Sequence, residues 1–174
     1  MLTDTETQQA PALRRWSVDG VTFDVKTLWN ITVVRGRFDR VGGFYEVGAS
    51  GTQIELTVDT GSLDTGDPAR DEQLRSIDGL GLAEHPQVRF DSTRVRAAGD
   101  GKLHVEGKLE AAGKVVPVEF DAKVRRVPGG LELDGSWKVD RRWLGRHGGE
   151  LPLSATAHVR VHLGEDGRRP TTAY

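Results

Sequence analysis

A charged stretch in the first half of the chain holds the residue types that acid–base chemistry uses. The segment "VDTGSLDTGDPARDEQLRS" runs from Val58 to Ser76 and contains Asp64, Arg70 and Asp71, and His85 follows it. Carboxylates and an imidazole can act as general acid and base when they lie within hydrogen-bond reach of a substrate. One hypothesis is therefore an enzyme site in which Arg70, Asp71 and His85 act together beside Asp64. The spacing does not require these side chains to meet, so we expect no catalytic residues here.

The same stretch has the signals of a short helical connection. Asp67 is a favourable N-cap and Pro68 suits the first helical position, so a helix is predicted from Pro68 to about Ser76. Asp71 and Arg75 are four residues apart and are predicted to pair on its surface, with Leu74 and Ile77 pointing inward. The charges would then cap and pin a connection instead of doing chemistry.

The histidines do not have the spacing of a metal site. His158 and His162 lie four residues apart in "HVRVH", which alternates like a strand. Four residues of strand span about 13 Å, too far for one ion with ligand bonds near 2 Å. His104 alternates in the same way with Glu106 and Lys108 and is expected to face solvent. Since the chain also has no cysteine, we expect neither a metal nor a cofactor.

Arginine pairs give the chain a second candidate function, nucleic-acid binding on a small barrel. They occur at Arg35 and Arg37, at 125–126 and at 141–142. The formal net charge is -2 and aromatic residues are only 6%, which disfavours this function. We interpret the arginines as part of a charged outer face and expect no nucleic-acid partner.

Alternation of apolar and polar residues with period two dominates the rest of the chain and predicts half-buried strands. Phase slips at Val33–Val34 and after Phe90 suggest bulges or bends. The turn signals "AAGDGK", "EAAGK" and "VPGG" join neighbouring strands as antiparallel pairs. Because closure removes exposed sheet edges, an eight-stranded antiparallel barrel is favoured over a sandwich. The eight predicted strands are centred on residues 21–25, 31–38, 54–58, 88–95, 103–109, 116–124, 131–139 and 151–163.

The inward faces of these strands carry few large apolar residues. Gly107 and Gly135 lie on the apolar face, as Gly36 is expected to, which leaves inner volume unfilled and marks strand bends. A barrel of eight strands is just wide enough to be filled by side chains or to hold one small ligand. An apolar cavity is therefore predicted, although the same residues would also serve as a filled core. The candidate lining is Phe23, Val25, Phe38, Ile54, Leu56, Phe90, Phe120 and Trp137.

Several ordered stretches carry a family resemblance. "SLDTGDPARDEQLRS" followed by "EHPQVRFDST" resembles the YceI-like, or polyisoprenoid-binding, family. Weaker matches are "WSVDGVTFDVK", "VRGRFD", "VEGKLEAAGKVVPVEF" and "VDRRWLG", so the resemblance runs from about Trp16 to Leu163. It implies a lipocalin-like barrel that carries or sequesters an amphiphilic lipid such as an isoprenoid in its lumen, without catalysis. The motif expected at the barrel end is Asp64, Thr65, Arg70, Asp71 and Arg75.

The chain ends suggest one domain with two loose segments. We expect flexible residues 1–13, a YceI-like barrel over 14–163 and a flexible tail over 164–174. The first residues lack a basic start and an apolar core, so no signal peptide is seen and a cytoplasmic location is expected. No apolar run approaches the roughly 20 residues of a membrane-spanning helix, so stable membrane insertion is not expected. The sequence leaves the choice between a monomer and a homodimer open.

Overall fold

The computed structural model describes residues 12–27, 33–76, 85–111, 113–140 and 154–165. Most of them belong to one sheet. The helical elements among them are a single turn of 3-10 helix, η1 (Thr60–Ser62), and the α-helix α1 (Pro68–Ser76). The strands are β1 (Arg14–Thr27), β2 (Val33–Phe38), β3 (Val41–Gly48), β4 (Gly51–Asp59), β5 (Leu63–Asp64), β6 (Gln87–Ala97), β7 (Lys102–Ala111), β8 (Lys114–Val127), β9 (Gly130–Asp140) and β10 (Ser154–Glu165).

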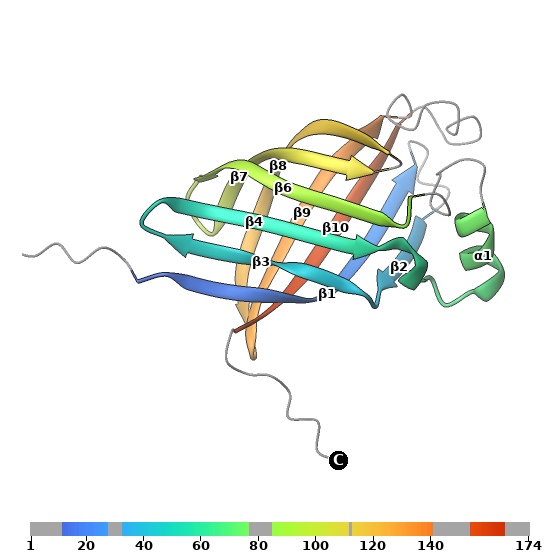
Figure 1. Ribbon diagram of the computed structural model, residues 1–174, viewed down its shortest axis with the longest axis horizontal. Coiled ribbons are helices and arrows are strands. Elements are labelled where there is room, and N and C mark those ends of the chain that lie inside the picture. The colour runs from blue at the N-terminus through green and yellow to red at the C-terminus, as the bar shows by residue number, and fades with distance from the viewer. Residues whose placement is uncertain (1–11, 28–32, 77–84, 112, 141–153, 166–174) are drawn as a thin grey trace, which may run out of the picture.

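The sheet closes into a barrel because its first and last long strands pair. The hydrogen-bonded order is β10-β9-β8-β7-β6-β4-β3-β1, and β1 also pairs with β10 from Trp16↔Glu165 to Thr27↔Ala155. All these neighbours are antiparallel. The predicted all-β fold, a single eight-stranded antiparallel lipocalin-like barrel with one short helix, is confirmed (Figure 1).

The strand β3 was not predicted as a separate strand. Together with β2 it makes one bent neighbour of β1, because β2 pairs with Val21–Lys26 and β3 with Arg14–Ser17. The corner falls at 39–40, where the Arg40 amide donates to Ser62 Oγ at 2.9 Å. The barrel therefore holds the predicted number of strands with a different assignment of residues.

Only one of the two predicted irregularities is found. The pairing of β6 with β7 shifts register between Ser92 and Arg94, close to the slip noted after Phe90. The pairing of β2 with β1 is regular from Val33 to Phe38, so the described residues have no bulge at Val33–Val34, and the alternative of a bend there stays a prediction. A further register shift lies in β1 between Val18 and Gly20, which the alternation did not indicate.

The tight hairpins follow from local turn chemistry. Pro128 and Gly129 alone connect β8 to β9, and Gly129 has φ 86, a left-handed value that a glycine adopts without steric cost. This turn fixes the register so that Arg125 faces Glu132 across the hairpin.

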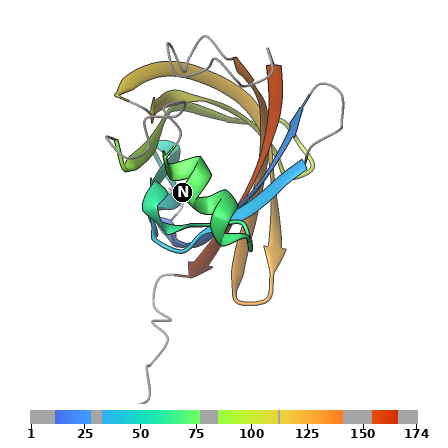
Figure 2. The same ribbon diagram turned by 90° about the vertical axis from the view of Figure 1, so that its right-hand side faces the viewer.

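The helix α1 lies at one end of the barrel (Figure 1), and in the view from that end it stands in front of part of the ring of strands (Figure 2). The predicted bounds of α1 are confirmed. Among the described residues, no helix is both long and apolar enough to cross a membrane.

Candidate functional site

The barrel is filled at one end and hollow at the other. Trp16, Leu103 and Leu131 stand near the starts of β1, β7 and β9 and are at most 8% exposed, and the adjacent Val105 is completely buried. Since these three strands run in the same direction, their first residues close the same end of the barrel. Beyond this plug the interior opens into a cavity of about 320 Å³.

The cavity is lined by residues of many strands, most of them with side chains that face inward. All eight residues proposed from the sequence as ligand lining stand on this wall; that they contact a ligand remains a prediction. Gly135, which the sequence placed on the inner face, also lines the cavity. Residues that were not proposed as lining complete the wall: Val18, Val21, Phe44, Tyr45, Glu55, Val58, Val88, Leu109, Val118, Leu133, Ala157, Val159, Val161 and Leu163.

Three glycines on the inner face each receive an aromatic ring. A Cβ on Gly107 would lie 2.5 Å from Phe90 Cε2, and one on Gly36 would lie 2.6 Å from Phe23 Cζ. At Gly135 the nearest ring atom is Cε2 of Phe120, at 3.1 Å. The space that a side chain would take is occupied by a ring at Gly36 and Gly107, and Gly135 lines the cavity itself. These glycines let the rings lie close to the wall, and this leaves space at the centre of the barrel.

The rings also contact one another along the wall. Phe120 lies with its centroid 5.6 Å from both Phe90 and Trp137, and Phe23 lies 5.1 Å from Phe38. Such offset and tilted pairs add stabilisation beyond their buried area. Aromatic side chains thus give two opposite parts of the cavity wall a defined shape.

Polar groups are scarce on the described part of this wall. Glu55 lines the cavity, but its carboxylate lies 3.6 Å from the Arg89 guanidinium in an ion pair. Tyr45 is 7% exposed and packs 5.5 Å from the Trp16 ring, and burial raises the pKa of its phenol. A cavity with an apolar wall and a few polar groups suits the hydrocarbon part of a small ligand.

The charged stretch after β4 is a connection held by capping bonds. Thr65 donates both its amide, at 2.9 Å, and its hydroxyl, at 2.5 Å, to Asp71 Oδ1, and Asp71 is 7% exposed. Asp67 Oδ1 accepts from the Ala69 amide at 3.0 Å as the helix N-cap. Asp64 binds the Arg37 guanidinium at 3.0 Å, which ties the connection to the corner of β2.

Arg70, which also belongs to the predicted barrel-end motif, adds its backbone amide to this network, 3.3 Å from Asp67 Oδ1. Arg70 is exposed on α1. Arg75 lies in the last turn of α1, and its side chain is outside the described residues, as are Leu74 and Ile77. The predicted pairing of Asp71 with Arg75 therefore stays a prediction.

The hypothetical acid–base set is spread over different contacts. The carboxylate of Asp71 is held by Thr65, whereas His85 lies against the turn between β7 and β8, where a Cβ on Gly113 would be 2.8 Å from its Nε2. Arg70 is exposed, and the hydrogen bond described for it comes from its backbone amide. The arrangement supports the interpretation of this stretch as a connection.

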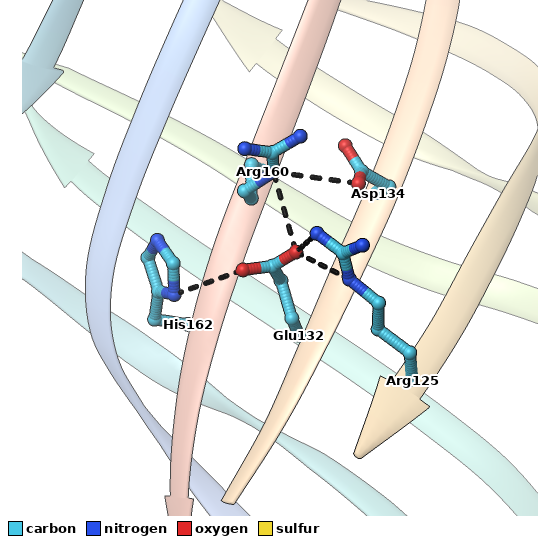
Figure 3. Close-up of polar contacts among 5 residues, drawn as sticks. All are labelled: Arg125, Glu132, Asp134, Arg160 and His162. Carbon is cyan, nitrogen blue, oxygen red and sulfur yellow. Dashed lines mark hydrogen bonds and ion pairs between the residues drawn. The ribbon is translucent and has the colours of Figure 1, made fainter. Parts of the chain in front are cut away.

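A buried carboxylate on the outer face of the barrel was missed by the sequence reasoning. Glu132 on β9 is 7% exposed and lies among Arg125, Arg160 and His162 (Figure 3). Its Oε1 accepts from Arg125 Nε at 2.7 Å and lies 3.4 Å from Arg160 Nε, and its Oε2 lies 3.5 Å from His162 Nδ1. The two-residue Pro-Gly turn was the available signal, because it sets Arg125 opposite Glu132.

Other outer-face charges pair as expected for a solvated surface. Arg35 lies 3.3 Å from Asp24, and His158 is exposed. The arginines at 141–142 are outside the described residues.

A family model and several solved structures match most of the barrel. The sequence profile of the YceI-like domain matches residues 16–164. The chain belongs to the YceI-like family. It is 38% identical over 87 residues to Protein YceI of Salmonella arizonae and to a UPF0312 protein of Pectobacterium atrosepticum. Each match covers 50% of this chain and 45% of the relative, so the chain matches a little under half the length of these relatives.

Solved structures share the barrel at lower sequence identity. BcnA of Burkholderia cenocepacia superimposes with a TM-score of 0.67 at 21% identity over 82% of this chain and 94% of that one. A polyisoprenoid binding domain from Saccharophagus degradans gives 0.63 at 14% identity over 88% and 99%. At these identities the likeness concerns the fold.

Proposed function

We propose that this YceI-like barrel binds an amphiphilic lipid, with an isoprenoid as the leading candidate, and carries or sequesters it without chemical change. The observation that carries the proposal is the apolar cavity of about 320 Å³ enclosed by the barrel. The family and the polyisoprenoid binding domain among its structural relatives support the choice of ligand class.

The size of the cavity sets the scale of the interaction. At about 30 Å³ per methylene-sized group, it has room for on the order of ten carbon atoms. Burying them would contribute roughly 8 kcal/mol before the costs of association are subtracted. Such a gain supports reversible binding of a chain segment, with the polar end of the ligand outside the apolar wall.

The test begins with the protein purified without detergent. Native mass spectrometry, followed by solvent extraction and identification of the extract, should reveal a co-purifying lipid of defined mass. Added prenyl alcohols should quench the fluorescence of Trp137, which stands on the wall, and Trp137→Phe should remove that part of the signal. A protein that carries no lipid and binds neither prenyl nor fatty-acyl amphiphiles would overturn the proposal.

A further inference from the structure

A second group of potential ligands lies on the outer face of the barrel, away from the cavity. His104 and Glu106 stand two residues apart on β7, so they share one face of the strand. Their cross-strand partners on β8 are Asp121 and Glu119. The four side chains therefore form two adjacent pairs, one imidazole among three carboxylates.

The imidazole is held by a carboxylate on each side. Its Nδ1 lies 2.8 Å from Asp121 Oδ1, and its Nε2 lies 2.8 Å from Glu119 Oε1. One ligand atom each from His104, Glu106 and Glu119 can be chosen so that all lie within 4.8 Å of one another. When Nδ1 carries the proton and donates it to Asp121, the lone pair on Nε2 points toward the other carboxylates.

We propose that His104 Nε2 and the carboxylates of Glu106 and Glu119 form a three-ligand site for a divalent cation of the zinc class, with Asp121 orienting the imidazole. A carboxylate that binds the second ring nitrogen is the usual outer-shell partner of a metal-ligating histidine. Solvent would complete the coordination of the ion.

The ligand atoms, which lie within 4.8 Å of one another, must rearrange to accept an ion. Two ligand atoms about 2.0 Å from a tetrahedral zinc ion lie about 3.3 Å apart. The 2.8 Å between His104 Nε2 and Glu119 Oε1 must therefore lengthen slightly. The Glu119 side chain is 64% exposed, so it can rotate to do this without disturbing the barrel.

The local charge favours a cation at this position. Three carboxylates meet here, and Arg96 approaches only Glu106, at 3.9 Å. A divalent ion held between these side chains would offset the mutual repulsion of the three carboxylates.

The mixture of ligands indicates which metal is bound. One imidazole with two carboxylates suits Zn²⁺, Co²⁺ or Ni²⁺ better than Mg²⁺ or Ca²⁺, which prefer oxygen ligands alone. A bound ion would join β7 to β8 on the outside of the barrel, while Leu109 and Phe120 of the same strands face the cavity.

The experiment uses the tag-free full chain, stripped of metal with a chelator and titrated with Zn²⁺ at pH 7.5 by calorimetry. We expect one saturable equivalent, and Co²⁺ should give a visible d–d absorption at the same stoichiometry. His104→Ala and Glu119→Gln should each weaken zinc binding at least tenfold, and Asp121→Asn about tenfold. His158→Ala, which removes an exposed histidine of β10, is the matched control and should leave the affinity unchanged.

Circular dichroism of each variant would verify that the barrel is intact. An affinity for Zn²⁺ that is unchanged in His104→Ala would overturn the proposal, as would the absence of saturable binding. Calcium binding equal to zinc binding would also overturn it, because that result identifies an acidic surface without a role for the imidazole.

Discussion

Filling the cavity from Ala157 should stabilise the ligand-free barrel and weaken ligand binding at the same time. Ala157 is 7% exposed, stands on the cavity wall and lies between Val25 and Trp137 on the neighbouring strands. Ala157→Phe adds about 100 Å³ at the packing density of protein interiors. This is roughly a third of the cavity's 320 Å³.

The two effects have separate magnitudes. At about 24 cal/mol per Å³ of cavity removed, the gain in unfolding free energy is at most about 2.4 kcal/mol, before any strain in the new ring. The ligand loses room for about three carbon atoms, or roughly 2.5 kcal/mol, which corresponds to an affinity on the order of a hundredfold weaker. Urea unfolding followed by circular dichroism measures the first effect, and displacement of a fluorescent fatty acid measures the second.

Ala122→Phe is the matched control. Ala122 is 4% exposed but belongs to the packed part of the core and does not line the cavity. The same substitution there overpacks the interior and should cost about 1–3 kcal/mol or more. If Ala157→Phe destabilised the protein as much as Ala122→Phe, the space beside Ala157 would be filled and the reasoning refuted. Unchanged ligand affinity in a stable Ala157→Phe would place the ligand elsewhere.

Three further predictions concern the wall and the outer face. Gly107→Ala should lower the unfolding free energy by about 1–3 kcal/mol in a urea titration, because its Cβ would meet the Phe90 ring at 2.5 Å. A stability equal to wild type would mean that the ring moves away freely. Glu132→Gln should lower the unfolding free energy by about 1–2 kcal/mol. This is less than for a fully buried ion pair, because its partner Arg125 is 53% exposed. The loss should be smaller in the Arg125→Met background, which a double-mutant cycle can show. Burial raises the pKa of Tyr45, so stability due to its protonated phenol is complete below about pH 10, the unfolded value, and is lost as the pH rises through the folded pKa. The ultraviolet titration of wild type minus Tyr45→Phe should show this delayed ionisation, and a difference curve centred at or below pH 10 would contradict it.

Strict alternation made most of the fold predictable, and its local failure explains what was missed. β8 alternates without interruption from Val116 to Val124 and was found. In β3, Gly42 and Gly43 interrupt the pattern. The Arg15 guanidinium lies over the next residue, Phe44, 4.1 Å from the centroid of the Phe44 ring. The residue after it, Tyr45, is buried in the core. A pattern of apolar and polar letters cannot separate these two aromatic residues, because cation–π contacts and core packing use the same side chains.

For the candidate site as well, the alternation predicted which residues line the cavity but not the contacts between strands. The positions of apolar residues in the alternation were enough to place Phe23 and Trp137, for example, on the cavity wall. The alternation did not predict that Phe90 would lie over Gly107, because that contact is diagonal: Phe90 pairs with Leu109, and Gly107 pairs with Ser92. Nor did it group His104 with Glu119, since the two belong to different strands and meet only through the register of β7 with β8. Contacts across strands require a register, which the alternation of a single strand does not contain.

The pairing of β1 with β10 has a consequence for the synthesis of the protein. A ribosome makes β1 first and β10 last, so a nascent chain that still lacks residues 154–165 has one unpaired side on β1 and another on β9. Such open edges are the surfaces through which β proteins aggregate. The closed barrel and its cavity form only after β10 has left the ribosome, so the ligand proposed here could be enclosed only from that point on.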